Sequence, residues 1–375
     1  MTNKREQGWH EWSGLLGALR DSKLNWLLIF VPVSVIMDFL GVPDLWVFIT
    51  SAIAIVPLAG LIGQATEQVA HRTGPGIGGL LNATFGNATE LIIAAFALAA
   101  GLQEVVKASI SGSIIGNILL VLGLSMLAGG WGRDKQTFNQ TNAGASAAML
   151  FLAAIALVMP AVFDLTLFGT LERTTPAIEQ LSLLVALVLL ATYLSSLVFS
   201  LRTHRSLFSS VAHEPEEPTL GMPAALSLLL GATVLAAVEA ELLVGAISEA
   251  TQALGMTEFF VGVIVVAVVG NAAEHFSAVV MAMKNKMDLA MTIATGSATQ
   301  IALFVAPVLV LLSFTIGQPM SLIFNAFEIG AVVVSVLILA IVSLDGESNW
   351  FEGVQLVAVY FILAIVFYFV PATVR

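Results

Sequence analysis

The sequence has no cysteine and little charge. Without cysteine the chain cannot form disulfides, thiolate metal sites or thiol nucleophiles, so any metal ligands must be oxygen atoms or imidazole nitrogens. Charged residues make up only 10% of the 375 residues, against about 25% in an ordinary globular domain. A nucleotide-binding Gly-Lys-Ser/Thr motif is also missing, which argues against a pump driven by ATP. The amino-terminal segment, residues 1–24, has no apolar stretch with a small-residue cleavage site, so we expect no signal peptide.

What the sequence has in abundance is long apolar runs. Apolar residues form 58% of the chain, and several runs approach the roughly 20 residues that a helix needs to cross a bilayer. The runs are continuous and do not alternate as the strands of a membrane barrel would. Because lipid offers the backbone no hydrogen bonds, helices are expected. The sequence therefore predicts an all-α polytopic membrane protein that has the lipid bilayer as a partner.

Glycine, proline and charge clusters divide the apolar sequence into eleven predicted spans. They are residues 25–40, 45–70, 78–100, 104–128, 142–163, 176–201, 222–254, 260–283, 287–315, 321–344 and 351–370. Residues 202–219 form a short polar linker with an acidic run at Glu214, Glu216 and Glu217, which we interpret as a solvated cytoplasmic segment.

The basic residues indicate the orientation, because cytoplasmic loops are enriched in lysine and arginine. If the amino terminus is cytoplasmic, one side holds Lys4, Arg5, Arg20, Lys23, Arg72, Arg133, Lys135, Arg202, Arg205, Lys284 and Lys286. The other side holds Lys107, Arg173 and Arg375. We expect the carboxyl terminus outside, in a prokaryotic plasma membrane, with a vacuolar membrane as the alternative.

The two halves of the chain carry a weak internal repeat. A shift of 184 residues superimposes Gly78, Ala83, Gly86, Asn87, Ala88, Glu90, Gly112 and Ser113 on Gly262, Ala267, Gly270, Asn271, Ala272, Glu274, Gly296 and Ser297. Each unit has five spans, an odd number, so the second copy enters the membrane with opposite orientation. We therefore predict one leading helix, a first repeat at 45–201 and an inverted second repeat at 220–375.

Glu90 and Glu274 lie in the middle of equivalent spans, where a charge costs about 2.5 to 3.5 kcal/mol on insertion scales. Asn87 and Asn271 stand three residues earlier, on the same helix face as the carboxylates. Gly86 and Gly270 precede them and allow either a close helix contact or a break that exposes carbonyl groups. The combined oxygen set is the kind that Ca²⁺ prefers. The alternative to cation binding is a purely structural role, in which the two glutamates are buried acids neutralised by hydrogen bonds.

Two carboxylates in a medium of low dielectric repel each other, which favours protonation of at least one when no cation is bound. Competition between Ca²⁺ and protons for one site is the simplest basis for antiport.

Na⁺ can compete for the site in the same way, so a Na⁺/Ca²⁺ exchanger is an alternative function. A cation channel is another alternative, and a hydrolase that uses paired acids is ranked lower. We predict a secondary antiporter that is not an enzyme, needs no cofactor and binds no nucleic acid, and we leave a homo-oligomer open.

Further polar residues lie near the predicted site. Candidates for the ligand shell or a proton path are Ser113, Asn117, Ser297, Thr299 and Gln300, together with His275, whose imidazole suits proton transfer. Candidates for entry sites are Glu67 and Glu241, whereas Glu239 and Glu249 are more typical of cavity walls or interfaces.

Four runs of residues resemble a known family. GPGIGGLLNATFGNATELI (Gly74 to Ile92) and VGNAAEH (Val269 to His275) resemble the two α-repeat signatures of calcium/proton exchangers, in the cation/calcium antiporter superfamily. GSIIGN (Gly112 to Asn117) and GSATQIAL (Gly296 to Leu303) are also similar to that branch.

The resemblance implies ten core helices plus a leading one, and Ca²⁺ and H⁺ as substrates. It implies Glu90 and Glu274 as central calcium ligands, ligand or gating roles for Asn87, Asn271 and Gln300, and a proton-linked role for His275. The linker is similar to the acidic segment that these proteins carry between their halves, although it is shorter.

Overall fold

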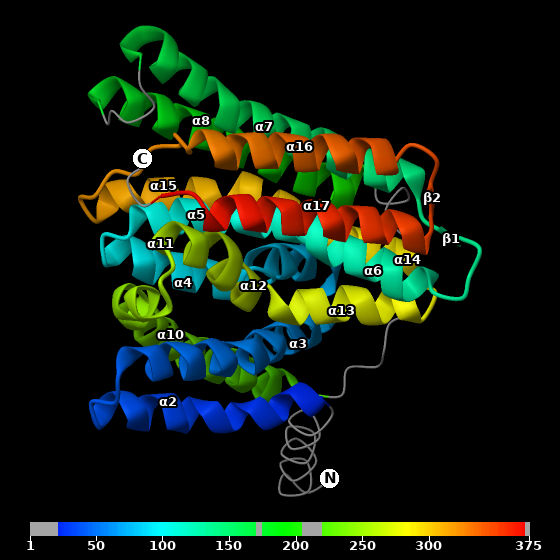
Figure 1. Cartoon of the computed structure of the whole chain (residues 1–375). Helices are drawn as coiled ribbons and strands as arrows, with labels where there is room; N and C mark the ends of the chain where they lie inside the picture. Colours follow the sequence, from blue (N-terminus) through cyan, green and yellow to red (C-terminus); the bar gives the residue numbers. More distant parts are fainter. Residues whose placement is uncertain (1–21, 170–174, 205–219, 372–375) are drawn as a thin grey trace, which may run out of the picture.

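The computed structural model describes residues 22–169, 175–204 and 220–371, and these form an almost entirely helical protein. The long helices run roughly along one common direction and are stacked in layers (Figure 1). Most of the predicted amino-terminal segment and linker, including the acidic run and Arg205, lies outside the described residues, as do Arg173 and Arg375.

The first half of the chain carries the elements up to residue 204. They are the 3₁₀ helix η1 (Lys23–Ile29), α2 (Phe30–Phe39), α3 (Asp44–Phe85), α4 (Ala88–Ala99), α5 (Gln103–Ile115), the π-helical turn η2 (Gly116–Val121), α6 (Leu122–Gly130), β1 (Gln136–Thr137), α7 (Gln140–Phe168), α8 (Pro176–Val198) and the π-helical turn η3 (Phe199–Thr203).

The second half begins at residue 220. Its elements are α10 (Met222–Leu254), α11 (Glu258–Phe260), the π-helical turn η5 (Val261–Val266), α12 (Ala267–Gly270), α13 (Ala272–Met283), α14 (Met287–Gln300), the π-helical turn η6 (Ile301–Val305), α15 (Ala306–Thr315), α16 (Ala326–Val342), β2 (Glu347–Ser348) and α17 (Trp350–Tyr368). The short strands β1 and β2 pair antiparallel and tie the two halves together at one end.

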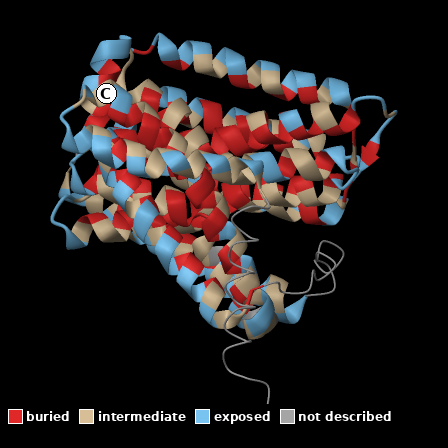
Figure 2. Cartoon of the chain, turned by 90° about the horizontal axis from the view of Figure 1, so that it is seen from below, coloured by how far each residue is buried: buried red, intermediate tan, exposed pale blue. Residues whose placement is uncertain are grey.

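The most buried helices lie in the middle of the molecule. In the span that combines α5, η2 and α6, 83% of the most apolar window is buried, against 22% in α8 and in α17. Figure 2 shows the same contrast, with buried residues concentrated in the central helices and exposed residues on the outer ones. Because the exposed side chains of α8 and α17 are large and apolar, we infer that these helices face lipid.

Seven helices in the described residues are long and apolar enough to cross a membrane, or eight if a pair bent by 60° counts as one span. The bent pair joins the helix ending at Gly270 to α13. The predicted spans 25–40, 78–100 and 321–344 appear as short or interrupted helices. By length and hydropathy the described part of the chain therefore has fewer spans than the eleven predicted from the sequence. The structure supports a helical membrane protein.

The spans predicted over residues 78–100 and 260–283 are interrupted helices, in agreement with the predicted alternative of a break beside Gly86 and Gly270. Both segments break beside the glycine of the repeat: Asn87 has φ −111° and ψ 31°, and Asn271 has φ −93° and ψ 5°. The turn between the second and third predicted spans is sharp, because Gly74 adopts a positive φ of 81° that other residues rarely adopt.

The predicted start of the tenth span at residue 321 is wrong, since α16 begins at Ala326. Asn325 and Glu328 form a capping box there, in which each side chain accepts a hydrogen bond from the other's backbone N–H. The apolar residues before Asn325 are buried without being helical, and hydrophobicity alone does not distinguish the two cases.

Candidate functional site

Two broken helices bring the predicted glutamates to one place. Asn87 immediately precedes α4 and Asn271 immediately precedes α13, and in each case the glutamate lies in the first turn of the following helix. The backbone N–H groups of a first turn have no partners within the helix and carry partial positive charge, which favours an anionic side chain there. Glu90 and Glu274 lie close enough for their charges to interact.

The two glycines of the repeat permit close approach beside these breaks. A Cβ atom on Gly270 would lie 3.0 Å from Cγ of Glu90, and one on Gly86 would lie 3.3 Å from Oε1 of Gln300. Contacts of that kind are tighter than most side chains allow. The glycines therefore stand where one half of the chain touches the candidate site residues of the other half.

Each asparagine bonds to a serine of the opposite half. Ser297 Oγ donates to Asn87 Oδ1 at 3.0 Å, and Asn271 Nδ2 donates to Ser113 Oγ at 2.9 Å. Since Ser113 and Ser297 are equivalent in the repeat, the two bonds join equivalent pairs of residues, although the serine donates in one and the asparagine donates in the other. The Asn87 amide also donates to Oε1 of Gln300. The bonds between asparagine and serine give a reason why these two residue types recur at equivalent positions of both halves.

Asn117 joins the two parts of this network. Its Nδ2 donates to Asn271 Oδ1 at 3.1 Å and to Ser297 Oγ at 3.0 Å. Its own Oδ1 is buried and has no hydrogen-bond partner among the described residues. Asn117 therefore has a buried amide oxygen that this network leaves unused.

Both glutamates also have a buried side-chain oxygen without a hydrogen-bond partner among the residues that the structure describes. Glu90 Oε1 and Glu274 Oε2 are buried and have no hydrogen-bond partner within the described part of the chain, and the same holds for Nε2 of His275. Carboxylate and amide oxygens suit a hard cation such as Ca²⁺, which takes 6 to 8 oxygen ligands. In the described residues no three acidic or histidine side chains lie together in a way that could hold a metal ion, so a bound Ca²⁺ would also need amide, hydroxyl or backbone oxygens.

A cavity of about 860 Å³ leads to the site from one side. Its walls include Glu274, Gly86, Gly270, Ser297 and Gln300 of the candidate site, and Glu67, Gln64, His71 and Asn82 farther out. It is also lined by Ser277 of α13 and Leu289 of α14, so it extends toward the turn between these helices, which carries Lys284 and Lys286. The cavity thus opens toward the end of the protein predicted to be cytoplasmic.

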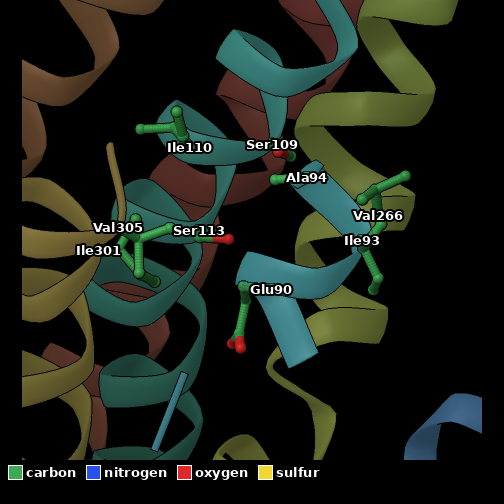
Figure 3. Close-up of a pocket in the computed structure, with 9 residues that line it drawn as sticks. All are labelled: Glu90, Ile93, Ala94, Ser109, Ile110, Ser113, Val266, Ile301 and Val305. Atoms are coloured by element: carbon green, nitrogen blue, oxygen red, sulfur yellow. The ribbon is translucent and has the colours of Figure 1, made fainter. Parts of the chain in front are cut away.

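The opposite side of the site is nearly closed. Glu90 borders a space of only about 10 Å³, lined mainly by apolar residues such as Ile93, Ile110 and Val266. Figure 3 shows the Glu90 carboxylate pointing away from Ala94 and Ser109, with Ser113 of α5 beside it. A volume of that size holds about one water molecule. The site is therefore accessible from one end only.

The acids of α10 lie away from the site. Glu241 and Glu249 are exposed and do not line the cavity, whereas Glu239 is fully buried and accepts a hydrogen bond from Ser34 of α2 at 2.8 Å. Glu241 follows Glu239 by two residues, so helix periodicity places it about 200° around the helix, on a different face. Because Glu241 does not line the cavity, its position gives no support to the expected entry role.

The hydroxyl of Thr299, a further candidate, donates to the backbone carbonyl of Thr295 in the same helix. His71 and Gln64 were missed by sequence reasoning. They lie near the end of an apolar span, and the residues at their repeat-equivalent positions are unlike them, so only the cavity reveals them.

Comparison with known proteins identifies the family. The description "Sodium/calcium exchanger protein" applies to the family that matches residues 44–202 and 224–369, which is most of the chain. The chain belongs to this exchanger family. The resemblance inferred from the sequence motifs is thereby confirmed.

Individual relatives agree with this exchanger assignment. A Ca(2+)/H(+) antiporter of Aphanothece halophytica is 48% identical over 362 residues, covering 92% of this exchanger and 96% of the relative. The Ca(2+)/H(+) antiporter ChaA of Bacillus subtilis is 44% identical and covers 90% and 96%, respectively. The solved structure of native YfkE superimposes with a TM-score of 0.81 at 40% identity, over 93% of this exchanger and 100% of that chain.

Proposed function

We propose that this exchanger is a secondary antiporter that exchanges Ca²⁺ for H⁺ across a membrane by alternating access. The observation that carries the proposal is the pair of equivalent glutamates, each in the first turn after a helix break and each with a buried carboxylate oxygen that has no partner in the described residues. Glu274 lines the cavity, and Glu90 borders the small closed space. The relatives named as Ca(2+)/H(+) antiporters support the choice of substrates.

In this proposal Glu90 and Glu274 bind Ca²⁺ directly, and Asn87 and Asn271 contribute amide oxygens. Gly86 and Gly270 let the two halves approach. Because both carboxylates are buried and close together, an empty site with two negative charges is costly, so either Ca²⁺ or protons occupy it. This competition couples the two fluxes without a separate energy source.

The remaining polar residues complete or support the shell. Ser113, Ser297, Asn117 and Gln300 hold the asparagines in position through the hydrogen bonds described above. His275 follows Glu274 directly, and its unpartnered Nε2 supports a role in proton transfer. Glu67 lines the outer cavity, where it attracts cations toward the site.

We further propose the architecture of one leading helix and two inverted five-helix repeats, divided as in the sequence analysis. The paired cross-half bonds from Asn87 to Ser297 and from Asn271 to Ser113 support such a pseudo-symmetric arrangement. Basic residues at the cavity end support a cytoplasmic amino terminus and a carboxyl terminus outside. We propose the prokaryotic plasma membrane as its location.

The test is ⁴⁵Ca²⁺ uptake into proteoliposomes driven by an imposed pH gradient. We expect uptake by the wild-type chain and its loss in Glu90→Gln and Glu274→Gln, which keep the side-chain shape and remove the charge. Glu241→Gln is the matched control, because that acid is exposed and remote from the cavity.

Two other arms of the same assay separate the alternatives. Uptake that requires a Na⁺ gradient and ignores the pH gradient would identify a Na⁺/Ca²⁺ exchanger. Calcium current without counter-transport would identify a channel. Transport by both glutamine variants at the wild-type rate would refute the assignment of the site.

A further inference from the structure

A buried carboxyl group outside the candidate site lies at the end of the protein remote from the cavity. Glu328, in the first turn of α16, is only 1% exposed. Its Oε2 accepts a hydrogen bond from the backbone N–H of Asn325 at 2.9 Å, and its Oε1 lies 2.8 Å from Oγ of Ser111 on α5. Glu328 therefore connects an outer helix of the second half to a central helix of the first half.

The partner of Glu328 has a single hydrogen to share. Ser111 Oγ also lies 3.0 Å from the backbone carbonyl of Ala108, to which it can donate. A serine hydroxyl carries one hydrogen, and a serine within a helix commonly gives it to a carbonyl one turn earlier. When Ser111 donates to Ala108, the hydrogen in its contact with Glu328 must come from the carboxyl group. The geometry thus accommodates a protonated Glu328.

The ionised form of Glu328 has no bound cation. Lys107 precedes Ser111 by one turn on α5, but its Nζ bonds to Glu104 at 3.1 Å, and the other ion pair in the described residues joins Lys135 to Glu347. A buried carboxylate without a partner is costly. Lys107 is itself mostly buried, with 11% of its side chain exposed, and it lies near enough for its charge to act on Glu328.

The surroundings of Glu328 contain few other titratable groups. Those on the described elements that pack against α16 are Glu104 and Lys107 on α5, Asp164 on α7, and Glu352, Tyr360 and Tyr368 on α17. Of these, Glu104 and Lys107 act on Glu328 electrostatically. An ionised Glu328 would therefore be neutralised by Lys107 turning away from Glu104.

The chain contains a neutral version of the same arrangement. Asn142 stands at the equivalent position of α7, where Asn139 caps the helix as Asn325 caps α16. Asn142 Nδ2 donates to Thr292 of α14 at 3.0 Å, so it too joins an outer helix to a central helix of the other half. An amide is enough for this structural connection. The carboxyl group of Glu328 supplies the capacity to bind a proton in addition.

Glu328 is also one helix away from the candidate site. Ser109 and Ser113 of α5 line the small space beside Glu90, whereas Ser111, between them in sequence, contacts Glu328. A change of charge at Glu328 therefore acts on the helix that forms the closed side of the site.

We propose that Glu328 is a second proton-binding site, separate from the paired glutamates, which exchanges its proton with the solution at the end of the protein remote from the cavity. On release, the carboxyl O–H bond breaks, the proton passes to water at that face, and Lys107 keeps its own proton while pairing with the carboxylate. The inference rests on the proton-coupled exchange proposed above.

The test compares wild-type chain with Glu328→Gln, in which the amide can still accept from Asn325 and donate to Ser111. Calcium exchange is measured in vesicles of known orientation while the pH is varied on one side at a time. We expect Glu328→Gln to lose one titration step in the response to pH on the Glu328 side, and to keep the response on the cavity side. Infrared spectra should show the loss of a protonated-carboxyl signal.

Two variants complete the design. Glu104→Gln removes the present partner of Lys107 and frees Lys107 to pair with Glu328, so the protonated-carboxyl signal should disappear at a lower pH than in the wild-type chain. Ser111→Ala retains the acid without its hydroxyl partner and should shift the titration midpoint, which gives a reading even if Glu328→Gln does not fold.

An unchanged pH response together with an unchanged carboxyl signal in Glu328→Gln would overturn the proposal. So would an unchanged midpoint in Ser111→Ala. Failure of the proposed function is distinguishable, because then the wild-type chain itself shows no uptake driven by pH, while the infrared comparison still reports on Glu328.

Discussion

Asn271 and Asn87 occupy equivalent places in the repeat but take part in different numbers of hydrogen bonds. The side chain of Asn271 takes part in four and that of Asn87 in two. The side chain of Asn142, which we use as a control, takes part in one. Sequence equivalence alone predicts equal effects of substitution at Asn87 and Asn271, whereas the structure predicts unequal ones.

The expected loss of unfolding free energy follows from the number of hydrogen bonds removed and the contribution of each bond to stability. Polar contacts within helical membrane proteins average about 0.6 kcal/mol in double-mutant cycles. Depending on which asparagine receives the Ser297 hydrogen, Asn271→Ala should lose about 1.8 to 2.4 kcal/mol of unfolding free energy, Asn87→Ala about 0.6 to 1.2 kcal/mol and Asn142→Ala about 0.6 kcal/mol. Ser297 has one hydrogen for the two asparagine oxygens, so Asn271 stays ahead of Asn87 by one to three bonds. Both residues stand at a helix break, so the gain in helix propensity largely cancels between them.

The assay is reversible unfolding in mixed micelles with increasing SDS, followed by circular dichroism. We expect Asn271→Ala to destabilise more than Asn87→Ala, and Asn87→Ala at least as much as Asn142→Ala. Equal losses at the two repeat positions would refute the claim that cross-half bonding, and not position in the repeat, determines the stability of the site.

Other predictions concern packing, access and capping. Gly112→Ala would place a Cβ atom on the Val263 carbonyl of η5, so overpacking should cost about 1 to 3 kcal/mol in the same assay. Gly144→Ala meets nothing within 4 Å and should be neutral or stabilising. Because the chain has no cysteine, Ser277→Cys should react with a water-soluble thiol reagent through the cavity, and Ile110→Cys should not. Asn325→Ala removes the capping box and should lower the unfolding free energy by about 1 kcal/mol, measured against the wild-type chain.

Much of the helical framework could be predicted from the sequence. The predicted span 222–254 coincides with α10, because proline near its start and Gly255 after its end mark both boundaries. The grouping of Glu90, Glu274, Asn87 and Asn271 also followed from depth and spacing, since charges within apolar spans are costly and are therefore informative.

From the sequence, a helix break beside Gly86 and Gly270 was one of two alternatives that could not be told apart, and the cross-half bonds could not be predicted. A local backbone turn at Asn87 or Asn271 leaves hydrophobicity unchanged, so an apolar run reads as one helix whether or not it is interrupted. The bond from Asn117 to Asn271 joins residues 154 positions apart. Glu328 escaped notice for a different reason: it lies in the first turn of its helix, where an acid is typical of a capping box.

The unequal spaces on the two sides of the site also have an electrical consequence. The wide cavity has the volume of roughly thirty water molecules. When water fills it, its high dielectric constant lets it carry little of the membrane potential, which then falls mainly across the closed layer beside Glu90. Moving one elementary charge through the full potential changes the free energy by about 2.3 kcal/mol per 100 mV. A cation arriving through the cavity thus crosses little of the field, and voltage acts chiefly on the transfer through the closed layer.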